Sequence, residues 1–310
     1  MPGGTLDPRA LLKYSVPLFI LPAMLKAAIL TAADGSAIDY YEIAVRQVMQ
    51  QILPLPFAST TIWAYGSAAH PNTVSSPAYT IEASFGRHVR VEWINGLTRA
   101  NGSFLPHLLP VDQTLHWANP PGPPDERGLN PQQYRGPVPM ITHLHGGHAK
   151  QDSDGYPEAW YLPNANNLSA FVKFGTWYER FRAQAEQRLD QKWEPGTAVF
   201  QYANDQRATT LWYHDHTLGM TRVNIYAGLA GFYLLRGGLN DLEGDELPKP
   251  APKLGDQPGT QYYEIPLMIQ DRSFEANGSL FYPNNRAFFE GLNERDLRIL
   301  TPMQGCRKHE

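Results

Sequence analysis

Glycine and proline limit the folds open to this chain more than any other feature of its sequence. Its 310 residues include 26 glycines and 27 prolines. Glycine weakens helix interiors through its backbone entropy, and proline does so because it lacks an amide N–H and clashes with the preceding turn. Hydrophobic residues make up 42% of the chain and charged residues 18%, so a core can form. The composition therefore predicts a turn-rich, all-β protein.

Segments with the pattern of β-strands are spread along most of the chain. Residues 41–45 alternate apolar and polar side chains, which is typical of a half-buried strand. Asn277-Gly278 is a strong turn signal and predicts a hairpin between residues 272–275 and 279–282. Runs rich in β-branched and aromatic residues predict further strands over residues 87–94, 140–145, 198–202, 208–214 and 224–235.

One segment has the pattern of a helix instead. Apolar residues recur every four positions between residues 177 and 189, with charged residues between them. Thr176 and Glu179 have the spacing of a capping box, which predicts the start of the helix, and Pro195-Gly196 predicts its end. We expect this helix to belong to an insertion at about residues 164–196, packed on the outside of a β-sandwich by its apolar stripe.

Shifts in composition predict the domain organisation. The sequence Tyr-Tyr-Glu-Ile at residues 262–265 repeats that at residues 40–43, which suggests a duplicated β domain. The 50 residues left for the second copy are about half of a sandwich of ~100 residues, so we expect it to be truncated. We expect a proline-rich arm, a first β domain that includes the helical insertion, a linker and an incomplete second domain, over residues 1–36, 37–238, 239–260 and 261–310.

Charge and hydropathy argue against two classes of partner. The net charge is −4 and the pI is about 6.2, so a broad basic face for nucleic acid is not expected. The most apolar early stretch, residues 18–30, is interrupted by Pro22 and Lys26 and is too short to span a bilayer. It also makes a poor signal peptide. We therefore expect no nucleic-acid partner and no membrane anchor.

Two His-x-His pairs are the strongest chemical signal in the sequence: His143 with His145, and His214 with His216. In a strand, residues i and i+2 point to one face, about 7 Å apart. One pair can therefore serve two neighbouring metal ions, and two adjacent strands can present four imidazoles to one cavity. Neutral imidazole binds copper, zinc, iron and nickel, and copper binds most strongly when the ligands are equal. The pattern predicts a metal site, with copper preferred.

The residues around both pairs resemble the multicopper oxidases. The matching segments are residues 142–147 and 152–160 around the first pair, and residues 211–216 and 222–231 around the second. The resemblance is strongest to bacterial spore-coat laccases, bilirubin oxidases and phenoxazinone-synthase-like enzymes, and it extends over about residues 6–293. It implies a cupredoxin-like Greek-key β-sandwich that carries both His motifs, followed by an incomplete second cupredoxin-like domain.

The resemblance also implies a reaction and a role for each site residue. Such enzymes oxidise phenols or aromatic amines at a mononuclear copper and reduce oxygen to water at a trinuclear copper cluster. The family pattern makes His143 a ligand of the type-2 copper, His145 a ligand of one type-3 copper, and His214 and His216 ligands of the two type-3 coppers. Asp154 matches an acidic residue that assists proton delivery, and would act as the catalytic acid. From its position alone, Asp154 is equally a loop residue that holds a turn.

The sequence contains only half of the ligands that this family uses. A complete cluster takes eight histidines from four His-x-His motifs, and two motifs are present here. The type-1 site needs a cysteine thiolate, but the surroundings of Cys306, the single cysteine, match no such site. We therefore expect the front half of a laccase-like enzyme, which needs a missing C-terminal half or partner chain. Its small-molecule partners would be an aromatic reducing substrate and oxygen.

Two other functions stay open at this point. The chain could be a non-enzymatic copper-binding protein or an inactive truncated β-sandwich, because four histidines can hold copper without a complete path for electrons. A zinc hydrolase has no further support, since the sequence contains neither His-Glu-x-x-His nor a nucleophile elbow. The compartment stays open as well, with a cytoplasmic or spore-coat-like location preferred to secretion.

Overall fold

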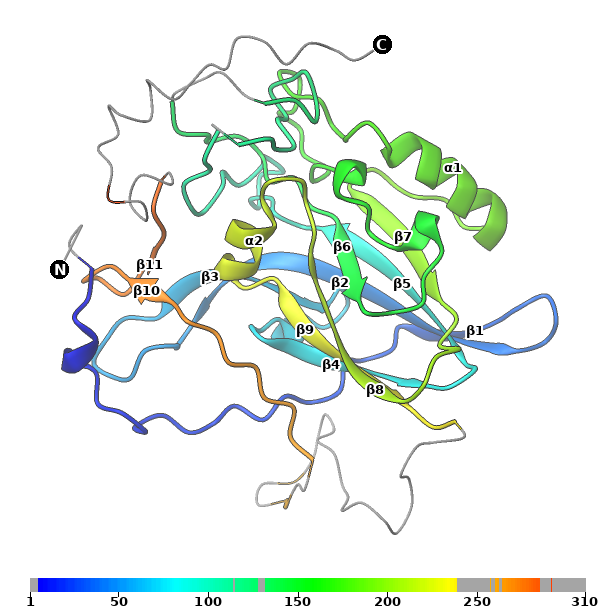
Figure 1. Cartoon of the computed structure of the whole chain (residues 1–310), viewed down its shortest axis with the longest axis horizontal. Coiled ribbons are helices and arrows are strands. Elements are labelled where there is room, and N and C mark those ends of the chain that lie inside the picture. Colours follow the sequence, from blue (N-terminus) through cyan, green and yellow to red (C-terminus); the bar gives the residue numbers. More distant parts are fainter. Residues whose placement is uncertain are drawn as a thin grey trace.

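Two β-sheets pack against each other and form the framework of the protein (Figure 1). The computed structural model describes residues 5–113, 115–127, 132–238, 257, 260–261, 264–284 and 291. In the first sheet, β2 is the longest strand and pairs antiparallel with β1 and β3 and parallel with β5, which in turn pairs antiparallel with β7. These strands are β1 (Ala28–Thr31), β2 (Ala37–Gln50), β3 (Thr60–Ser67), β5 (His88–Asn95) and β7 (Thr197–Tyr202).

The second sheet carries both His-x-His pairs. Its order is β4-β9-β8-β6, with β4 parallel to β9 and the other pairs antiparallel. Four of the seven strand pairs of these two sheets, β2–β5, β5–β7, β4–β9 and β6–β8, join strands that are not consecutive in the chain, and this crossover pattern agrees with the expected cupredoxin-like Greek-key sandwich. The strands are β4 (Ala78–Ser84), β6 (Thr142–His145), β8 (Thr209–Asp215) and β9 (Ala230–Arg236).

Three large aromatic side chains join the two sheets at the centre of the core. Tyr65 of β3 and Trp93 of β5 come from the first sheet, and Tyr213 of β8 comes from the second. The Tyr65 ring centroid lies 5.5 Å from that of Trp93 and 5.3 Å from that of Tyr213. All three are completely buried. Aromatic side chains bury more apolar area than any others, so this contact is a main source of the sandwich's stability.

The predicted strands agree with the observed ones except in one segment. Residues 224–235, predicted to be one strand, form the end of helix α2 (Thr221–Ala227) and then β9. Gly228 separates the two with a φ of 131°, which an L-residue rarely adopts. Val223 and Ile225 favour a strand locally, but buried hydrogen bonds of the Asn224 side chain to Asp215 and to the carbonyl of Pro139 hold the segment as a helix.

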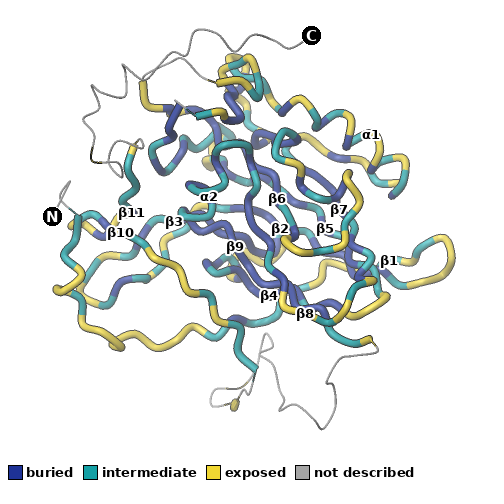
Figure 2. The backbone as a smooth tube through the Cα atoms, in the orientation of Figure 1, coloured by how far each residue is buried: buried dark blue, intermediate teal, exposed yellow. Residues whose placement is uncertain are grey.

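The predicted helix is present as α1 (Tyr178–Leu189), on the outside of the sandwich (Figure 2). Its apolar residues Phe181, Ala185 and Leu189 are buried. The predicted capping box is wrong. Trp177 occupies the N-cap position without a side-chain hydrogen bond, and the Thr176 hydroxyl donates to Asp125 instead. The helix also ends before the predicted Pro-Gly signal, because Asp190 takes a left-handed conformation with a φ of 50°.

The ends of the described chain add smaller elements. Residues 28–31, inside the predicted arm, form β1 and so extend the first sheet. The predicted hairpin is present as β10 (Ser273–Phe274) and β11 (Leu280–Phe281), closed by a turn at Gly278. Tyr262 and Tyr263 of the proposed repeat, and nearly all of the predicted linker, lie outside the described residues, so the domain boundaries stay a prediction. Short 3₁₀ turns are η2 (Pro8–Ala10), η3 (Pro71–Thr73), η4 (Gln151–Ser153) and η5 (Pro157–Ala159).

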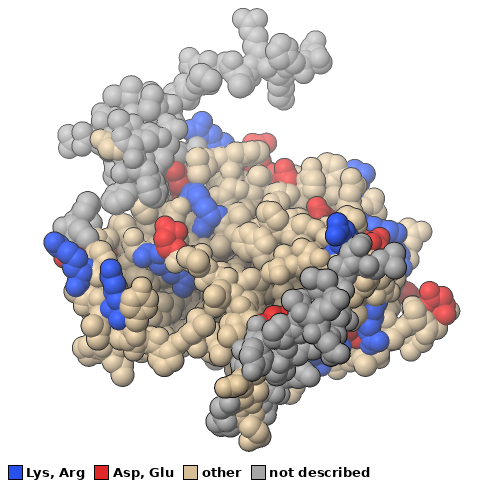
Figure 3. Space-filling model, turned by 60° about the horizontal axis from the view of Figure 1, so that its bottom comes forward, with Lys and Arg blue, Asp and Glu red and all other residues tan. Residues whose placement is uncertain are grey.

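Two further properties concern the surface charge and the helices of the described chain. On the face drawn in Figure 3, the described basic side chains are scattered among acidic ones and form no continuous basic surface. Neither α1 nor α2, the two α-helices of the described ranges, is long and apolar enough to cross a membrane.

Candidate metal centre

The pairing of β6 with β8 brings the two His-x-His pairs together. His143 lies directly opposite His214 in the antiparallel ladder, and His145 lies opposite Trp212. Because side chains alternate between faces along a strand, His143, His145 and His214 share one face of the sheet. His216 follows the last residue of β8, and its backbone N–H donates to the carbonyl of Ile141 at 2.8 Å.

All four imidazoles predicted from the sequence form one cluster. The ring centroid of His143 lies 5.6 Å from that of His145, 5.6 Å from that of His214 and 4.7 Å from that of His216. His214 lies 5.4 Å from His145 and 5.9 Å from His216, again between ring centroids. Two short extended segments thus place four nitrogen ligands of the same kind in a single small region.

Two imidazoles are oriented by backbone carbonyls of the loop that follows η4. The Nδ1 atom of His143 contacts the carbonyl oxygen of Asp154, and Nδ1 of His216 lies 3.0 Å from the carbonyl oxygen of Gly155. A carbonyl oxygen can only accept, so Nδ1 carries the proton in each neutral ring. Each Nε2 atom then keeps its lone pair, which is the arrangement that metal-ligating histidines need.

His214 and His145 face each other inside the cluster. Nδ1 of His214 lies 2.7 Å from the carbonyl oxygen of Asp215, which again leaves Nε2 as the ligating atom. That Nε2 lies 3.2 Å from Nδ1 of His145. Two imidazole nitrogens that bind one ion tetrahedrally at 2.0–2.1 Å would be about 3.3 Å apart. The two rings are within hydrogen-bond distance of each other, and the same separation is compatible with one shared ion.

The described residues offer no more than two donors to any one ion. Within the described ranges, no three His, Cys, Asp or Glu side chains converge on one position for a metal ion. A metal ion at this cluster would therefore need further ligands besides these side chains. The donor set itself, four imidazoles without a thiolate, suits copper, zinc or other borderline metals.

Burial keeps two rings of the cluster, His214 and His216, in the protonation state that binds metals. Desolvation, together with the neighbouring imidazoles, lowers the pKa of His214 to about 4. Desolvation also lowers the pKa of His216. Both rings are therefore neutral at pH 7, and a neutral ring has a free lone pair for a metal ion.

The structure places Asp154 next to the cluster. Its backbone carbonyl contacts His143, and its carboxylate Oδ1 lies 3.6 Å from Nδ1 of the same ring. The Asp154 side chain is 44% exposed, so the carboxylate reaches both solvent and the cluster. Both the turn-holding and the proton-transfer interpretations are compatible with this position.

Asp215 points to the opposite side of the strand, as expected for a residue between two ligands. It is completely buried and accepts hydrogen bonds from the Thr217 hydroxyl at 2.9 Å and from Asn224 Nδ2 at 2.9 Å. Burial raises the pKa of Asp215 to about 7. Asn224 also contacts Nε2 of the buried His107, so a polar network lies behind the sheet.

Sequence reasoning missed two residues that shape the cluster. The Trp212 ring centroid lies 4.0 Å from that of His214 and 5.4 Å from that of His145, so the indole covers one side of the cluster. Gly155 has a φ of 78°, and a Cβ there would lie 2.1 Å from the Thr142 carbonyl oxygen. Trp212 could have been found from its i, i+2 spacing to His214, which places both side chains on one face of the strand. The need for glycine at residue 155 depends on a contact with Thr142, which no local sequence pattern encodes.

The other histidines of the described residues lie outside the cluster. His148 is an exposed loop residue that contacts Asp205 at 3.1 Å. His107 is buried, whereas His70 and His116 are exposed, and none of them contacts the four imidazoles. Cys306 lies outside the described residues.

Sequence comparison finds laccases and other multicopper oxidases. The chain is 38% identical over 246 residues to a laccase of Bacillus stratosphericus and 32% identical over 245 residues to a laccase of Bacillus subtilis (strain 168); each alignment covers 79% of this chain and 36% of the relative. It is 33% identical over 223 residues to multicopper oxidase LPR1 of Arabidopsis thaliana, which covers 72% of this chain and 29% of that protein. No protein-family model matches the chain. The chain thus spans about a third of the length of these relatives.

Solved structures of multicopper oxidases also match, with lower sequence identity. McoA of Aquifex aeolicus has a TM-score of 0.44 and 16% sequence identity, and the match covers 87% of this chain and 38% of that chain. A multicopper oxidase of Campylobacter jejuni, described as a metallo-oxidase, has a TM-score of 0.42 and 15% identity over 75% of this chain and 31% of that chain.

Proposed function

Since about four fifths of this chain is homologous to part of laccases and other multicopper oxidases, we propose that it supplies half of the ligands of a trinuclear copper cluster. The complete enzyme would be a copper-dependent oxidase that takes electrons from phenolic or aromatic-amine donors and reduces oxygen to water. The other half of the ligands would come from a C-terminal part or a partner chain. The observation that supports this proposal is the gathering of four imidazoles in one cluster at the β6–β8 pair.

The geometry supports a specific division of the ligands among the ions. The contact between His145 Nδ1 and His214 Nε2 at 3.2 Å favours one shared type-3 copper for this pair. His143 and His216 turn their Nδ1 atoms to carbonyl oxygens, and each would bind a different ion through Nε2. We assign His143 to the type-2 copper and His216 to the second type-3 copper.

Copper, when bound, would supply the one-electron chemistry of the reaction. The chain's own residues would prepare the site for it. The carbonyls of Asp154 and Gly155 hold two imidazoles in the tautomer that ligates, and the Trp212 indole shields His214 and His145 on one side. The half-exposed carboxylate of Asp154 would move protons between solvent and the cluster, because it lies 3.6 Å from the His143 ring.

A second candidate is a copper-binding protein without oxidase activity. It is favoured by the observation that no three donors of the described ranges meet at one ion. Such a chain would bind copper through pairs of imidazoles but would lack a mononuclear site to take electrons from a donor. Metal binding alone does not separate the two candidates, but oxidation of a phenolic dye in the presence of the missing half does.

Titration of the full chain with Cu²⁺ by isothermal calorimetry tests the metal site. We expect the metal-free chain to bind Cu²⁺, and the double variant His143→Ala/His214→Ala to lose more than the roughly 10–100-fold in affinity that outer-shell changes cost. The matched control is His148→Ala/His70→Ala, which removes two exposed imidazoles outside the cluster and should leave the affinity unchanged. Equal binding by the two double variants would refute the site.

A further inference from the structure

The orientation of two imidazoles depends on the loop of residues 151–155. This loop contains η4 (Gln151–Ser153) and provides the carbonyls of Asp154 and Gly155 that contact His143 and His216. A three-residue 3₁₀ turn has poor hydrogen-bond geometry and does not fix its own position. Its N-cap residue, Lys150, makes no side-chain capping hydrogen bond either. Contacts from other elements must therefore hold the loop in place.

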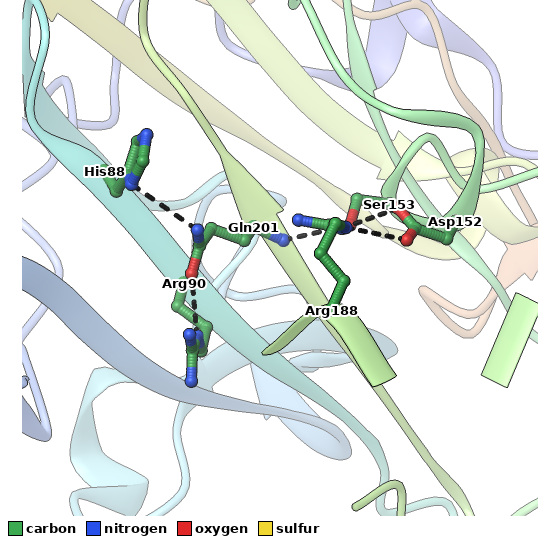
Figure 4. Close-up of polar contacts among 6 residues, drawn as sticks. All are labelled: His88, Arg90, Asp152, Ser153, Arg188 and Gln201. Atoms are coloured by element: carbon green, nitrogen blue, oxygen red, sulfur yellow. Dashed lines mark hydrogen bonds and ion pairs between the residues drawn. The ribbon is translucent and has the colours of Figure 1, made fainter. Parts of the chain in front are cut away.

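Arg188, in the last turn of α1, makes the strongest of these contacts (Figure 4). Its Nε donates to Asp152 Oδ2 at 2.8 Å, and its Nη2 donates to Asp152 Oδ1 at 2.6 Å and to Ser153 Oγ at 2.8 Å. The Asp152 side chain is 7% exposed and that of Arg188 is 23% exposed. A two-point guanidinium–carboxylate contact with little solvent is both strong and directional.

A second contact reaches the same loop from the sheet. The backbone N–H of Gln201, on β7, donates to Ser153 Oγ at 3.1 Å, and Ser153 is completely buried. The Gln201 side chain is held in turn by Arg90 Nε at 2.9 Å and lies 3.4 Å from His88 Nδ1 (Figure 4). The Ser153 hydroxyl oxygen therefore sits between a guanidinium from α1 and an amide from β7, and the loop cannot shift without breaking one of them.

We propose that Arg188 is a positioning residue that holds the loop of residues 151–155, and thereby orients the imidazoles of His143 and His216 toward copper. The helical insertion thus supports the metal centre although α1 itself contributes no ligand. The part of this inference that concerns copper rests on the proposed function. The part that concerns imidazole orientation is a property of the chain itself.

His214 provides an internal control for this proposal. His214 directs its Nδ1 to the carbonyl of Asp215, the next residue in its own segment, and not to the loop. Loss of Arg188 should therefore disturb His143 and His216 and leave His214 unchanged. A general loss of stability would instead affect all three imidazoles alike.

The test uses the full chain with Arg188→Met and NMR of the imidazole nitrogens in ¹⁵N-histidine-labelled protein. We expect the share of the Nδ1–H tautomer to fall at His143 and His216 and to stay the same at His214. The matched control is Arg182→Met, on the same helix. Arg182 forms an ion pair with Glu179 of the same helix and not with the loop of residues 151–155. This control should leave all three rings as in the unchanged chain.

Copper affinity provides a second readout. We expect Arg188→Met to weaken Cu²⁺ binding roughly 10-fold, at the lower end of the cost of outer-shell changes. Arg188→Lys keeps the charge without the two-point contact, so its Cu²⁺ affinity should lie between those of Arg188→Met and the unchanged chain. Arg182→Met should bind Cu²⁺ as the unchanged chain does. If Arg188→Met does not fold, as judged by circular dichroism, Arg188→Lys and Asp152→Asn provide the same two measurements in milder form.

Two results would overturn the proposal: unchanged tautomers at His143 and His216 in a folded Arg188 variant, or equal shifts at all three rings. The proposal of a copper site has a separate test. If the unchanged chain binds no Cu²⁺, the proposed metal centre is wrong, while the tautomer measurement still decides the role of Arg188.

Discussion

Backbone carbonyls, rather than acidic side chains, orient three of the four clustered imidazoles. His143, His214 and His216 each turn Nδ1 to a main-chain oxygen, and only His143 also has a carboxylate within 4 Å. A carbonyl is neutral and cannot take the ring proton, so it sets the tautomer without charging the ring. At the residue scale, these contacts therefore leave the Nε2 atoms of the three rings available to a metal ion.

Burial also decides the protonation of His107, behind the sheet. The ring is buried, contacts the Leu109 carbonyl oxygen at 2.7 Å and packs edge-on against Trp63. Desolvation lowers its pKa from 6.5 to about 4. In the unfolded chain the ring takes up its proton near pH 6.5, whereas in the folded chain it does so only near pH 4. Between these values the unfolded state binds more protons, so folding becomes less favourable as the pH falls.

Between pH 6.5 and pH 4.5 we expect His107 to lower the free energy of unfolding by about 2 kcal/mol, against the opposite effect of Asp215, whose raised pKa favours the folded state as the pH falls. The variant His107→Gln does not titrate and should lose this share of the pH dependence. Urea unfolding of both proteins at the two pH values measures it. If both proteins lose the same stability over this range, His107 is not the group responsible.

At the element scale, short irregular segments do as much as strands to build the site. β6 and β8 place the histidine backbones, but η4 and the residues after it set two of the ring orientations. Gly155 lets this loop lie directly against β6, since a Cβ would lie 2.1 Å from the Thr142 carbonyl oxygen. The close approach therefore requires glycine both for its φ and for the space.

Gly155→Ala tests this close approach. Gly35→Ala is the matched control, because Gly35 also has a positive φ, 85°, but a Cβ there would meet nothing within 4 Å. We expect the control to lose about 1 kcal/mol of stability from backbone strain alone, and Gly155→Ala to lose more than about 2 kcal/mol and to shift the His216 resonances. Urea unfolding and NMR measure the two effects. Equal losses in both variants would show that the loop does not need this approach.

At the scale of the whole molecule, the cluster lies at the edge of a sheet. β6 is the last strand of its sheet, and in the part of the chain that the structure describes it pairs only with β8. His145, at the end of β6, is exposed. Donors from another chain segment can therefore approach the cluster from this side, as the proposed function requires.

The 310-residue chain should not behave as a laccase by itself. Its single cysteine has no neighbouring ligand motif, and no more than two described donors serve one ion. We expect copper-loaded chain to show no intense absorption at about 600 nm, where a copper–thiolate site absorbs. We also expect no oxidation of a phenolic dye. Visible spectroscopy and a dye assay check both, and a strong blue band would contradict the proposed division of the copper sites.

Much of this fold and site could be predicted from sequence because the signals are local. Alternation marked the strands, and the four-residue apolar repeat marked α1. The two His-x-His pairs marked the four clustered rings because residues i and i+2 of a strand share a face whatever surrounds them. The predictions that failed, the capping box at Thr176 and the strand before Gly228, are those in which a distant partner, Asp125 or Asp215, competes with a local preference.

By itself, the sequence determined the β class, the position of the helix and the identity of the four imidazoles, because each depends on spacing along a few residues. Only the tertiary structure decided that His143 lies opposite His214, that two carbonyls of a loop orient the rings, and that Arg188 of α1 holds this loop. These contacts join residues far apart in the chain. They follow from how the sheets and the helix pack together, which no short pattern in the sequence encodes.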